Sequence, residues 1–444
     1  MLRVVPIALA IVLCFSNLGF IDLGGRVAEE NSVKVADAQA PRNHLTTDKN
    51  VQAAVIEEVY EFEDATDEPA PDAPEEIVQR EENILRLFWD IVPGAVKYEV
   101  LIEGATFYAY TNGIEIPIDN LSAKFQVNAL SLEGTTLQNK LPIVILDTNP
   151  TAPLTTTEFD KMNYPPIYPV YSWVPTSGAS HYEIELIKDG KIIRRYFTNS
   201  QTHDDDFDLY DKQPVLDEGE YFWRVRALTS DGRPLTRWSE KNSSNSFEVK
   251  HQIRFCALGD SITHGGGSIS VPPSTVMYNW ETYCAIPVKN LGRSGDTTAE
   301  ILARFDNDVL PFRPEVLFIM AGVNDYRANI LGWESVENLQ ALEAKCEQNG
   351  IKPVFLTPTP LNPAQIQKLN FIDPPPADWQ EHQQFICAWI RDQKYFIDVN
   401  EKLTDADGNL IDSLSVDGLH PDADGKRFIG EAVAAWLDRY LNLK

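Results

Sequence analysis

The stretch Ile253-Arg254-Phe255-Cys256-Ala257-Leu258-Gly259-Asp260-Ser261 decides the fold of the C-terminal part of the chain. It begins as an apolar run of strand length and ends in a Gly-Asp-Ser turn, which is typical of a buried strand followed by a sharp bend. Ser261 therefore lies where the strand ends. In open α/β sheets, ligands bind at the carboxyl ends of the strands. Ser261 is thus a candidate nucleophile, although a serine needs a base to act as one.

Short apolar runs and stretches of helical period alternate from Ile253 to the end of the chain. Such alternation predicts a mostly parallel sheet with helices on both faces. We therefore expect an α/β domain over residues 251–444. Its further predicted strands are 286–291, 315–320, 351–356 and 395–399, and its predicted helices are 298–308, 334–348, 379–392 and 424–441.

Polar residues that could support an attack by Ser261 occur elsewhere in this domain. Hydrolysis of an ester needs a nucleophile, a base, a carboxylate that orients the base, and donors for the developing oxyanion. His420 can accept the proton of Ser261, and Asp417, three residues earlier, can orient the imidazole. Asn324 offers a side-chain N–H, and a glycine near position 295 can bring its backbone N–H close because it has no Cβ. Helix caps and Asx turns are the alternative roles, but the complete set favours catalysis.

His264 is a second histidine near the candidate nucleophile, in a glycine-rich loop. It could compete as the base, but no carboxylate in a comparable local motif supports it. We therefore expect His264 to be a loop residue or a substrate contact. The glycine run 265–267 is not expected to bind phosphate, because no lysine follows at the spacing of a phosphate loop.

Four blocks of this domain resemble the motifs of the GDSL, or SGNH, hydrolases, and they occur in the family's order. The blocks are Gly259-Asp260-Ser261, Asn290–Asp296, Gly322-Val323-Asn324-Asp325 and Asp417–His420. Ile262 stands where the family has leucine, which is a conservative change. The second block holds both Gly292 and Gly295, and Gly295 matches the family better. The Gly-x-Ser-x-Gly elbow of the α/β-hydrolases is absent from the sequence, which argues against that rival fold.

The resemblance implies a flavodoxin-like α/β/α sandwich and hydrolysis of acyl esters through an acyl-serine intermediate, without a cofactor or a metal ion. It assigns Ser261 as the nucleophile, His420 as the base and Asp417 as the partner of His420. The oxyanion donors would be the backbone N–H groups of Ser261 and Gly295 and the side chain of Asn324.

An internal repeat precedes the α/β domain, and its members are shifted by 84 positions. The pairs are Trp89 and Trp173, Gly94 and Gly178, and Tyr98 and Tyr182. Alternating runs such as 182–186 and 222–227 are typical of half-buried strands. Short strands, turn signals and an early tryptophan in each copy indicate two all-β sandwich domains, over residues 83–150 and 151–250. The pattern resembles fibronectin type III modules, so the whole chain is expected to be multidomain.

These modules could contact glycans or cell-surface partners. Trp238, Tyr168 and Tyr171 are aromatic residues that could stack on sugar rings if they were exposed. Packing in the core or at a sheet edge is the commoner role of such residues, and we expect it here. The two modules are accordingly interpreted as spacers or positioning domains.

The N-terminal residues 1–40 have the form of an export signal. Arg3 precedes an apolar stretch from Val4 to Ile21, and small residues near Ala38 offer cleavage sites, although these lie far downstream. The stretch is borderline in length for a membrane span, so it could also remain as a signal anchor and membrane tether. Residues 41–82 are acidic and rich in proline, which predicts an extended linker. We therefore expect an extracellular or cell-surface protein.

The composition excludes several kinds of partner and site. The formal net charge is −28 over 444 residues, and phosphate backbones would repel so acidic a protein, so nucleic acid is not an expected partner. None of the five cysteines lies in a Cys-x-x-Cys pair, the usual sign of a zinc or redox site. The four that follow Cys14 have apolar neighbours, which favours buried free thiols over disulfides.

We interpret the chain as an exported serine ester hydrolase that removes O-acyl groups, first of all acetyl groups, from polysaccharide or from an acylated small molecule. A lysophospholipase or thioesterase would use the same four blocks but needs an apolar groove beside Ser261. The stretches 269–278 and 361–376, which would form its walls, are mixed in polarity. A non-catalytic surface binding protein is the alternative from another class, and the complete set of catalytic groups argues against it.

Overall fold

The computed structural model describes residues 76–80, 83–118, 124–165, 167–198, 207–265, 270–272 and 274–442. The export segment expected at 1–40 lies outside these residues, as does the linker expected at 41–82 except for residues 76–80. No helix within the described part of the chain is long and apolar enough to span a membrane.

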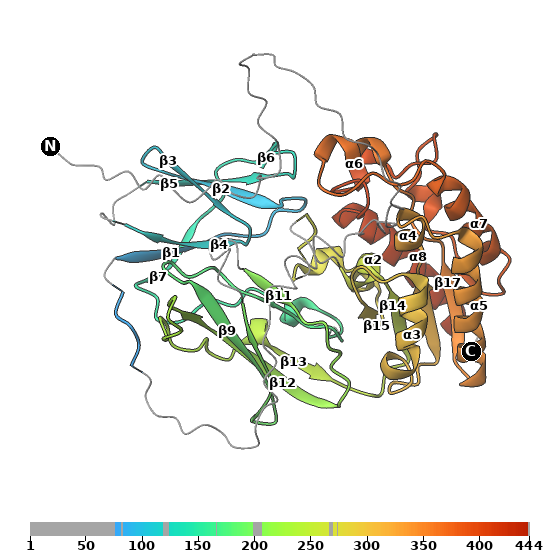
Figure 1. The fold of residues 1–444 in the computed structure, drawn as a ribbon, viewed down its shortest axis with the longest axis horizontal. Coiled ribbons are helices and arrows are strands. Elements are labelled where there is room, and N and C mark those ends of the chain that lie inside the picture. The colour runs from blue at the N-terminus through green and yellow to red at the C-terminus, as the bar shows by residue number, and fades with distance from the viewer. Residues whose placement is uncertain are drawn as a thin grey trace, which may run out of the picture. The chain divides into compact units, whose positions relative to one another are not determined.

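A five-stranded parallel sheet forms the centre of the C-terminal α/β region, which is coloured from yellow to red in Figure 1. Its order, β15-β14-β16-β17-β18, is the 2-1-3-4-5 order of flavodoxin-like sheets. Every residue of β14 and β16 is buried, as expected when both faces are covered, and the predicted parallel sheet is confirmed. The strands are β14 (Phe255–Gly259), β15 (Lys289–Gly292), β16 (Val316–Met320), β17 (Lys352–Leu356) and β18 (Phe396–Ile397).

Helices connect these strands. α3 contacts α5 and α5 contacts α7, whereas α8 contacts β18 and the 3-10 turns η3 and η4. The helices thus form two groups, α3, α5 and α7 in one and α8 with η3 and η4 in the other. Right-handed crossovers explain the two groups, because the chain moves one way across the sheet from β14 to β15 and the other way from β15 to β18. The helices are α2 (Ser261–His264), α3 (Thr298–Asp308), α4 (Val323–Arg327), α5 (Gly332–Gln348), α6 (Pro363–Leu369), α7 (Trp379–Arg391) and α8 (Ala423–Asn442), and the 3-10 turns are η3 (Val276–Tyr278), η4 (Trp280–Tyr283), η5 (Asn400–Lys402) and η6 (Asp412–Leu414).

The four predicted helices are confirmed, with ends that differ by at most two residues. α6 was not predicted, because it begins inside the proline-rich stretch 361–376. There Asn362 is the N-cap, accepting the backbone N–H of Gln365 at 3.0 Å, and Pro363 occupies the first turn. Proline has no N–H to lose at that position, so it can start a helix as well as break one.

The first antiparallel region contains two sheets, with the orders β4-β1-β7 and β3-β2-β5-β6. Buried and half-buried residues alternate along β2, the pattern of a strand with one covered face. Buried residues of both sheets, among them Leu87 and Val100, form one hydrophobic cluster. The strands are β1 (Ile84–Phe88), β2 (Lys97–Ile102), β3 (Ala105–Ala109), β4 (Gly113–Pro117), β5 (Phe125–Leu130), β6 (Thr136–Gln138) and β7 (Val144–Thr148).

The second antiparallel region also contains two sheets, with the orders β10-β9-β12-β13 and β11-β8. The N-terminal part of the described chain is therefore rich in antiparallel strands, as expected. The strands are β8 (Val170–Ser172), β9 (His181–Lys188), β10 (Lys191–Phe197), β11 (Asp208–Tyr210), β12 (Gly219–Leu228) and β13 (Ser246–Val249), and the 3-10 turns are η1 (Phe159–Lys161) and η2 (Ser243–Asn245).

The internal repeat of the sequence corresponds to a repeated corner in the structure. Trp89 and Trp173 are both buried, and each ring packs on the tyrosine nine residues later, with centroids 5.3 and 5.0 Å apart. Gly94 and Gly178 follow with φ of 77° and 81°, a conformation that glycine adopts without strain. In each copy the tyrosine hydroxyl accepts a backbone N–H from six residues upstream. The two regions thus share a local structure as well as a sequence pattern.

The sequence repeat suggests two separate β modules, but the hydrophobic cores group the described residues in another way. Buried residues of the second antiparallel region, such as Trp173 and Trp223, belong to the same cluster as Ile319 and Val433 of the α/β region. The first antiparallel region has a cluster of its own. The second region and the α/β region therefore share one core.

Two of the aromatic residues considered for sugar stacking are buried. Tyr168 and Tyr171 are 2% and 0% exposed, so stacking on a sugar is excluded for them and the expected packing role is confirmed. Trp238 is half-buried, and the guanidinium groups of Arg224 and Arg226 lie 4.4 and 4.5 Å from the centroid of its ring. The ring of Trp238 thus already stacks against cations of the protein.

The cysteines of the described region are buried free thiols, as predicted; they are Cys256, Cys284, Cys346 and Cys387. Burial raises the pKa of the Cys284 thiol to about 12. A thiol that stays protonated is a poor nucleophile and a poor metal ligand, so packing accounts for these residues.

Candidate active site

Ser261, His420 and Asp417 meet at the carboxyl end of the parallel sheet. The Ser261 Oγ lies 3.0 Å from His420 Nε2, and His420 Nδ1 lies 2.8 Å from Asp417 Oδ2. The three residues are 3%, 4% and 0% exposed. A hydroxyl, an imidazole and a carboxylate linked in this order can generate a nucleophile at neutral pH.

The residues around Ser261 fix the turn that follows β14. Asp260 is the N-cap of α2, and its Oδ1 accepts a backbone N–H of the first turn at 2.9 Å. A Cβ on Gly259 would lie 2.4 Å from Thr263 Oγ1 and 2.5 Å from the carbonyl oxygen of Met320, so only glycine fits at the end of β14. Ser261 is then the first helical residue, and the first N–H groups of a helix have no intrahelical acceptor.

The turn Asp417–His420 holds its own carboxylate and imidazole together. Asp417 Oδ1 accepts the backbone N–H groups of Leu419 and His420 at 3.0 and 2.8 Å, which leaves Oδ2 to face the imidazole. Gly418 has a φ of 87°, and a Cβ there would lie 2.7 Å from the carbonyl oxygen of Asn362. The three-residue spacing seen in the sequence is therefore one backbone turn closed by the aspartate side chain.

The carboxylate of Asp417 stays ionised although it is completely buried. Burial alone would raise its pKa, but the charge of His420 and the hydrogen bonds that the carboxylate accepts outweigh burial and hold the pKa well below the usual value. Asp417 can therefore stabilise the imidazolium that forms when His420 takes a proton.

Ser270 is a contact of Asp417 that the sequence motifs did not reveal. Its Oγ donates to Asp417 Oδ2 at 2.8 Å, and the side chain is buried. This donor binds the same oxygen that faces His420, so it restricts the rotation of the carboxylate. Ser270 lies 147 residues before Asp417 in a stretch without a motif, and no sequence signal pointed to it.

Gly295 and Asn324 follow the two strands that flank β14. Gly295, with a φ of 84°, lies in the turn after β15, and Asn324 lies in the first turn of α4, after β16. Since β14 pairs with both strands, the turns that carry Ser261, Gly295 and Asn324 share one edge of the sheet. Asn324 Nδ2 donates to the carbonyl oxygen of Asp296 at 3.0 Å, and an amide has a second N–H for a ligand.

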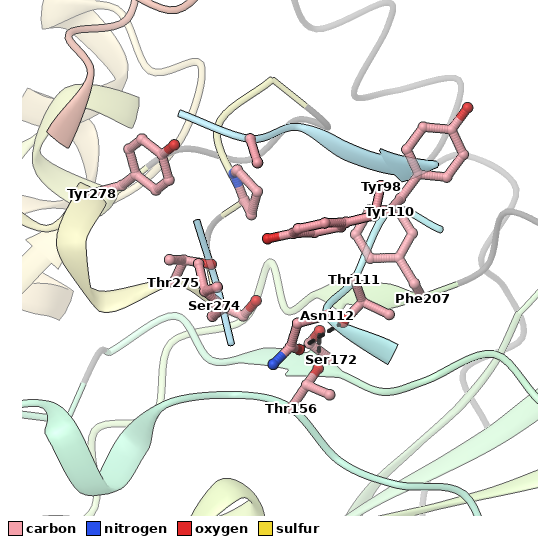
Figure 2. A pocket seen from close by; sticks show the side chains of 13 residues that line it. Tyr98, Tyr110, Thr111, Asn112, Thr156, Ser172, Phe207, Ser274, Thr275 and Tyr278 are labelled. Carbon is pink, nitrogen blue, oxygen red and sulfur yellow. Dashed lines mark hydrogen bonds between the residues drawn. The ribbon is translucent and has the colours of Figure 1, made fainter. Parts of the chain in front are cut away.

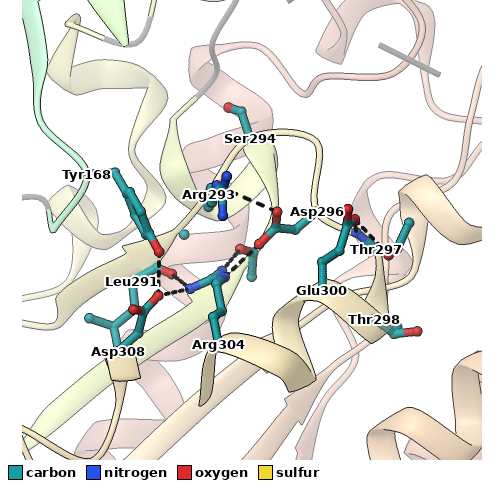
Figure 3. A network of polar contacts seen from close by, with 12 residues as sticks. Tyr168, Leu291, Arg293, Ser294, Asp296, Thr297, Thr298, Glu300, Arg304 and Asp308 are labelled. Atoms are coloured by element: carbon teal, nitrogen blue, oxygen red, sulfur yellow. Dashed lines mark hydrogen bonds and ion pairs between the residues drawn. The ribbon is translucent and has the colours of Figure 1, made fainter. Parts of the chain in front are cut away.

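Arg304 ties the turn after β15 to the sheet, as Figure 3 shows. Its Nε donates to Asp296 Oδ2 at 2.6 Å and its Nη1 to Asp308 Oδ2 at 2.8 Å. The same guanidinium donates to one backbone carbonyl oxygen near the end of each of β14 and β15. All three side chains are buried, so these bonds hold Asp296 and its turn firmly in place.

Two tyrosines of the second antiparallel region bond to α3 and to the turn before it. Tyr168 Oη donates to Asp308 Oδ2 at 2.6 Å. Tyr210 Oη accepts the backbone N–H of Ser294 at 3.0 Å. Neither contact was predicted, because each joins segments that are far apart in the sequence and carry no shared motif.

The loop position expected for His264 was wrong. It is the last residue of α2 rather than a loop residue, and its side chain is buried. Its Nε2 lies 3.2 Å from the carbonyl oxygen of Tyr168, and its ring packs edge-on against Tyr210. The second antiparallel region covers His264, and the sequence pattern of α2 alone cannot show that.

Buried titratable groups also lie around α2. Lys426 Nζ donates to the carbonyl oxygen of Ile262 and joins α8 to α2. Burial lowers the pKa of Lys426 to about 8, and burial raises the pKa of Glu281 to about 8 and that of Asp260 to about 7. Among the described residues, no group of three or more His, Cys, Asp or Glu side chains is arranged to hold a metal ion.

A pocket whose lining includes none of Ser261, Asp417 and His420 is formed by both antiparallel regions together with Pro272, Ser274, Thr275 and Tyr278 (Figure 2). It encloses about 430 Å³ of space not filled by atoms, including the part open to solvent, and about 30 Å³ of it is wide enough for the centre of a water molecule. Its thirteen lining residues carry eight hydroxyl groups and no charge. Among them, the rings of Tyr110 and Phe207 stack with centroids 6.2 Å apart.

Comparison with known proteins identifies the α/β region. Residues 257–428 match the model of the GDSL-like Lipase/Acylhydrolase family, which confirms the resemblance read from the four sequence blocks. A curated relative, the uncharacterized lipoprotein YqeF of Bacillus subtilis (strain 168), is 35% identical over 82 residues. That match covers 17% of this chain, and the chain spans about a third (34%) of the length of that relative.

Solved structures of similar proteins each match less than half of the chain. A GDSL-like lipase from Bacteroides thetaiotaomicron is 22% identical, with a TM-score of 0.34 over 43% of this chain and 91% of that one. A lipase/acylhydrolase from Enterococcus faecalis is 22% identical, with a TM-score of 0.34 over 42% and 95% of the two chains. An acetylxylan esterase from Geobacillus stearothermophilus is 18% identical, with a TM-score of 0.32 over 41% and 92%.

Proposed function

Because residues 257–428 form a GDSL-like lipase/acylhydrolase domain, a domain of carboxylic ester hydrolases, we propose that this chain hydrolyses O-acyl esters through an acyl intermediate on Ser261. The observation that carries the proposal is the pair of hydrogen bonds from Ser261 to His420 and from His420 to Asp417. A turn that served only to cap a helix would need no imidazole against the serine hydroxyl.

In the first half of the reaction, Ser261 Oγ attacks the ester carbonyl carbon while His420 Nε2 takes the hydroxyl proton. The carbonyl oxygen becomes an oxyanion, for which the backbone N–H groups of Ser261 and Gly295 and the Asn324 amide are the proposed donors. Collapse of the tetrahedral intermediate breaks the bond to the alcohol oxygen. His420 passes its proton to that oxygen, so the alcohol leaves and the acyl group stays on Ser261.

In the second half, His420 takes a proton from a water molecule, whose oxygen attacks the acyl-serine carbonyl carbon. Collapse of the second tetrahedral intermediate breaks the bond to Ser261 Oγ, which recovers its proton from His420. The carboxylic acid is released. Asp417 accepts the hydrogen bond of the Nδ1–H throughout, and so keeps Nε2 free to take and return protons.

The proposed substrate is a short acyl ester, in the first place an acetyl group on a carbohydrate. The side chains of Ser261 and His420 are almost completely buried, and such an enclosed nucleophile favours a small acyl group over a long chain that needs an open groove. Nucleic acid is not a proposed partner, because the net charge of −28 would repel it.

The substrate preference is tested with p-nitrophenyl acetate, butyrate and octanoate, using the purified protein and Ser261→Ala. We expect acetate to be cleaved fastest and Ser261→Ala to abolish turnover, while Ser230→Ala, at an exposed turn of the second antiparallel region, leaves it unchanged. Preference for octanoate would instead favour a lipid or thioester substrate. If wild-type protein and Ser261→Ala were equally inert on all three esters and on acetylated xylan, a non-catalytic binding function would replace the proposal.

The two antiparallel regions are proposed to be β-sandwich modules of the fibronectin type III kind, over residues 83–150 and 151–250, that help to hold a glycan. Two sheets share a core in the first region, and both regions have the same tryptophan–tyrosine corner. The pocket of Figure 2 suits a neutral, hydroxyl-rich ligand, because its lining has eight hydroxyl groups, aromatic rings and no charge.

The pocket is tested by titrating neutral oligosaccharides into Ser261→Ala protein and following binding by calorimetry. Tyr110→Ala should weaken binding, since it removes one of the two stacked rings. Tyr108→Ala, two residues away on an exposed position of β3, is the matched control and should not. Equal affinities of the two variants would remove the pocket from the proposal.

Export through residues 1–40 is also proposed, with these residues either cleaved or kept as a membrane tether and with residues 41–82 as the spacer. Fractionation of cells that express the full chain tests this. Protein in the medium indicates cleavage, and protein in the membrane fraction indicates a tether. Protein confined to the cytoplasm would contradict export.

A further inference from the structure

The turn between β15 and α3, residues 293–296, is held from two sides. On the side of the α/β region, the buried guanidinium of Arg304 binds the carboxylate of Asp296 (Figure 3). On the other side, Tyr210 Oη accepts the backbone N–H of Ser294 at 3.0 Å. The next N–H along the chain is that of Gly295, the proposed oxyanion donor. Tyr210 is thus one peptide unit away from a group that would touch the reacting oxygen.

Tyr210 is itself fixed in position. It ends β11, pairs with Val170 of β8, and is only 8% exposed. Burial raises the pKa of its hydroxyl above the usual value, so the hydroxyl stays neutral and can accept an N–H at any pH near neutrality. Its ring packs edge-on against His264, with centroids 4.8 Å apart. Since His264 is the last residue of α2, Tyr210 contacts both the helix that begins with Ser261 and the turn that carries Gly295.

Such a fixed acceptor matters because oxyanion donors act through preorganisation. A donor lowers the barrier only if it already points at the place where negative charge will develop. Gly295, with a φ of 84° and no Cβ, has more conformational freedom than any other residue would have at that position. The chain just before it therefore needs an external anchor, and the hydrogen bond from the Ser294 N–H to Tyr210 provides one in the preceding peptide unit.

We infer that Tyr210 is a positioning residue for ester hydrolysis: its hydroxyl holds the Arg293–Ser294 peptide, and so fixes the start of the adjoining Ser294–Gly295 peptide with the Gly295 N–H aimed at the oxyanion. This inference rests on the proposed function. It makes the second antiparallel region a part of the oxyanion site rather than a spacer. The bond from Tyr168 to Asp308, which in turn binds Arg304, supports the same turn from the same region.

The test compares Tyr210→Phe with Tyr182→Phe. Both substitutions keep the ring and remove a buried tyrosine hydroxyl that accepts a backbone N–H, at 3.0 Å from Ser294 and at 2.6 Å from Thr176. Tyr182 lies in the second antiparallel region, and its bond stays within that region. The Tyr182→Phe variant therefore shows how the loss of such a hydroxyl affects activity when the turn 293–296 is left intact.

For Tyr210→Phe we expect kcat on p-nitrophenyl acetate to fall roughly tenfold to a hundredfold, the size of effect that a small misplacement of a catalytic group produces. KM should change by less than about twofold, because the lost interaction acts mainly in the transition state. The inhibition constant of an alkylboronic acid, whose tetrahedral serine adduct resembles that state, should rise in parallel with the fall in kcat/KM. Tyr182→Phe should leave all three quantities unchanged.

Hydrogen exchange gives a readout that does not depend on activity. The amides of residues 294 and 295 should exchange faster in Tyr210→Phe than in the wild type, and at the wild-type rate in Tyr182→Phe. The inference is overturned if Tyr210→Phe keeps wild-type kcat and wild-type exchange, or if both variants lose activity equally.

The proposed function and the inference fail in different ways. If the wild type does not hydrolyse any ester and does not bind the boronic acid, the proposed function fails and the inference falls with it. If the wild type is active and Tyr210→Phe is indistinguishable from it, only the inference fails.

Discussion

Single residues in the candidate site have their roles set by what surrounds them. The carboxylate of Asp417 accepts four hydrogen bonds, two on each oxygen, and one of these comes from the Nδ1–H of His420. These donors keep the carboxylate charged in a buried place and keep the imidazole in the tautomer that leaves Nε2 free. An asparagine side chain has nearly the same shape but carries no charge and offers an N–H where an acceptor is needed.

Asp417→Asn is therefore expected to lower kcat by roughly 10³- to 10⁴-fold with little change in KM, because the lost charge acts on the imidazolium of the transition state. Steady-state kinetics with p-nitrophenyl acetate measure this. Asp412→Asn, at an exposed position of η6, is the control and should keep wild-type kcat. An Asp417→Asn enzyme with unchanged kcat would remove Asp417 from the mechanism.

The sequence could reveal only those site residues that stand in a local motif. Ser261, Asp417 and His420 follow strands or turns whose residue types already suggest the chemistry. Ser270 and Tyr210 act through contacts with residues 147 and 84 positions away, and serine and tyrosine are common in loops and sheets. Only the fold brings such residues to the site, so no local pattern marks them.

Among the secondary-structure elements, β15 leads into the turn of the candidate site and carries a buried lysine that destabilises the fold. Lys289 lies in this strand with 0% exposure, and its Nζ has no hydrogen-bond partner in the described structure. The ammonium group lies 5.4 Å from the centroid of the Phe312 ring. Burial lowers the pKa of Lys289 to about 7, because the low-dielectric interior disfavours the charge. β15 therefore carries a stability cost immediately before the turn that holds Gly295.

Lys289→Met is expected to stabilise the protein, and more so at pH 7 than at pH 9.5. An unfolded lysine has a pKa of about 10.4, so between about pH 10 and pH 7 the unfolded state binds more protons than the folded state. The wild type therefore loses stability as the pH falls through this window, and a methionine does not. Urea unfolding at both pH values measures the difference.

Lys352→Met, at a half-buried position of β17, is the control for this experiment and should show no comparable pH dependence. A gain for Lys289→Met that was equal at the two pH values would show that Lys289 is not a buried charge.

Long periodic elements were predictable and short ones were not. The apolar face of α8 repeats over twenty residues, and its ends were placed within one residue. β15 was expected from 286 but begins at Lys289, because Pro287 has no N–H for the ladder. α4 has only five residues, too few for a helical period to appear in the sequence.

At the scale of the whole molecule, the two hydrophobic cores determine which regions should unfold together. The sequence repeat indicated two equivalent modules, and the equivalence is real at Trp89 and Trp173. Their surroundings differ, since Trp89 belongs to the core of the first antiparallel region and Trp173 to the core shared with the α/β region. Periodicity in a strand reports that one face is covered but not which element covers it, so the sequence could not distinguish the two modules.

Trp173→Ala and Trp89→Ala form a matched pair that tests this difference. Removal of a buried tryptophan costs about 3–5 kcal/mol of stability. Trp173→Ala should shift the urea concentration at which esterase activity is lost to lower values, because the shared core unfolds as one unit. Trp89→Ala should leave that midpoint unchanged, although it destabilises the first antiparallel region. Equal shifts in the two variants would contradict the separation of the cores.

The most direct test of the central claim is covalent labelling of Ser261 by a fluorophosphonate, with the labelled residue located by mass spectrometry of peptides. We expect one equivalent of label on Ser261 in the wild type, and little label in His420→Ala, because the hydroxyl then lacks its base. Label on Ser261 would support a nucleophile activated by His420 and Asp417. Failure of Ser261 to react in folded wild-type protein, or equal labelling with and without His420, would contradict it.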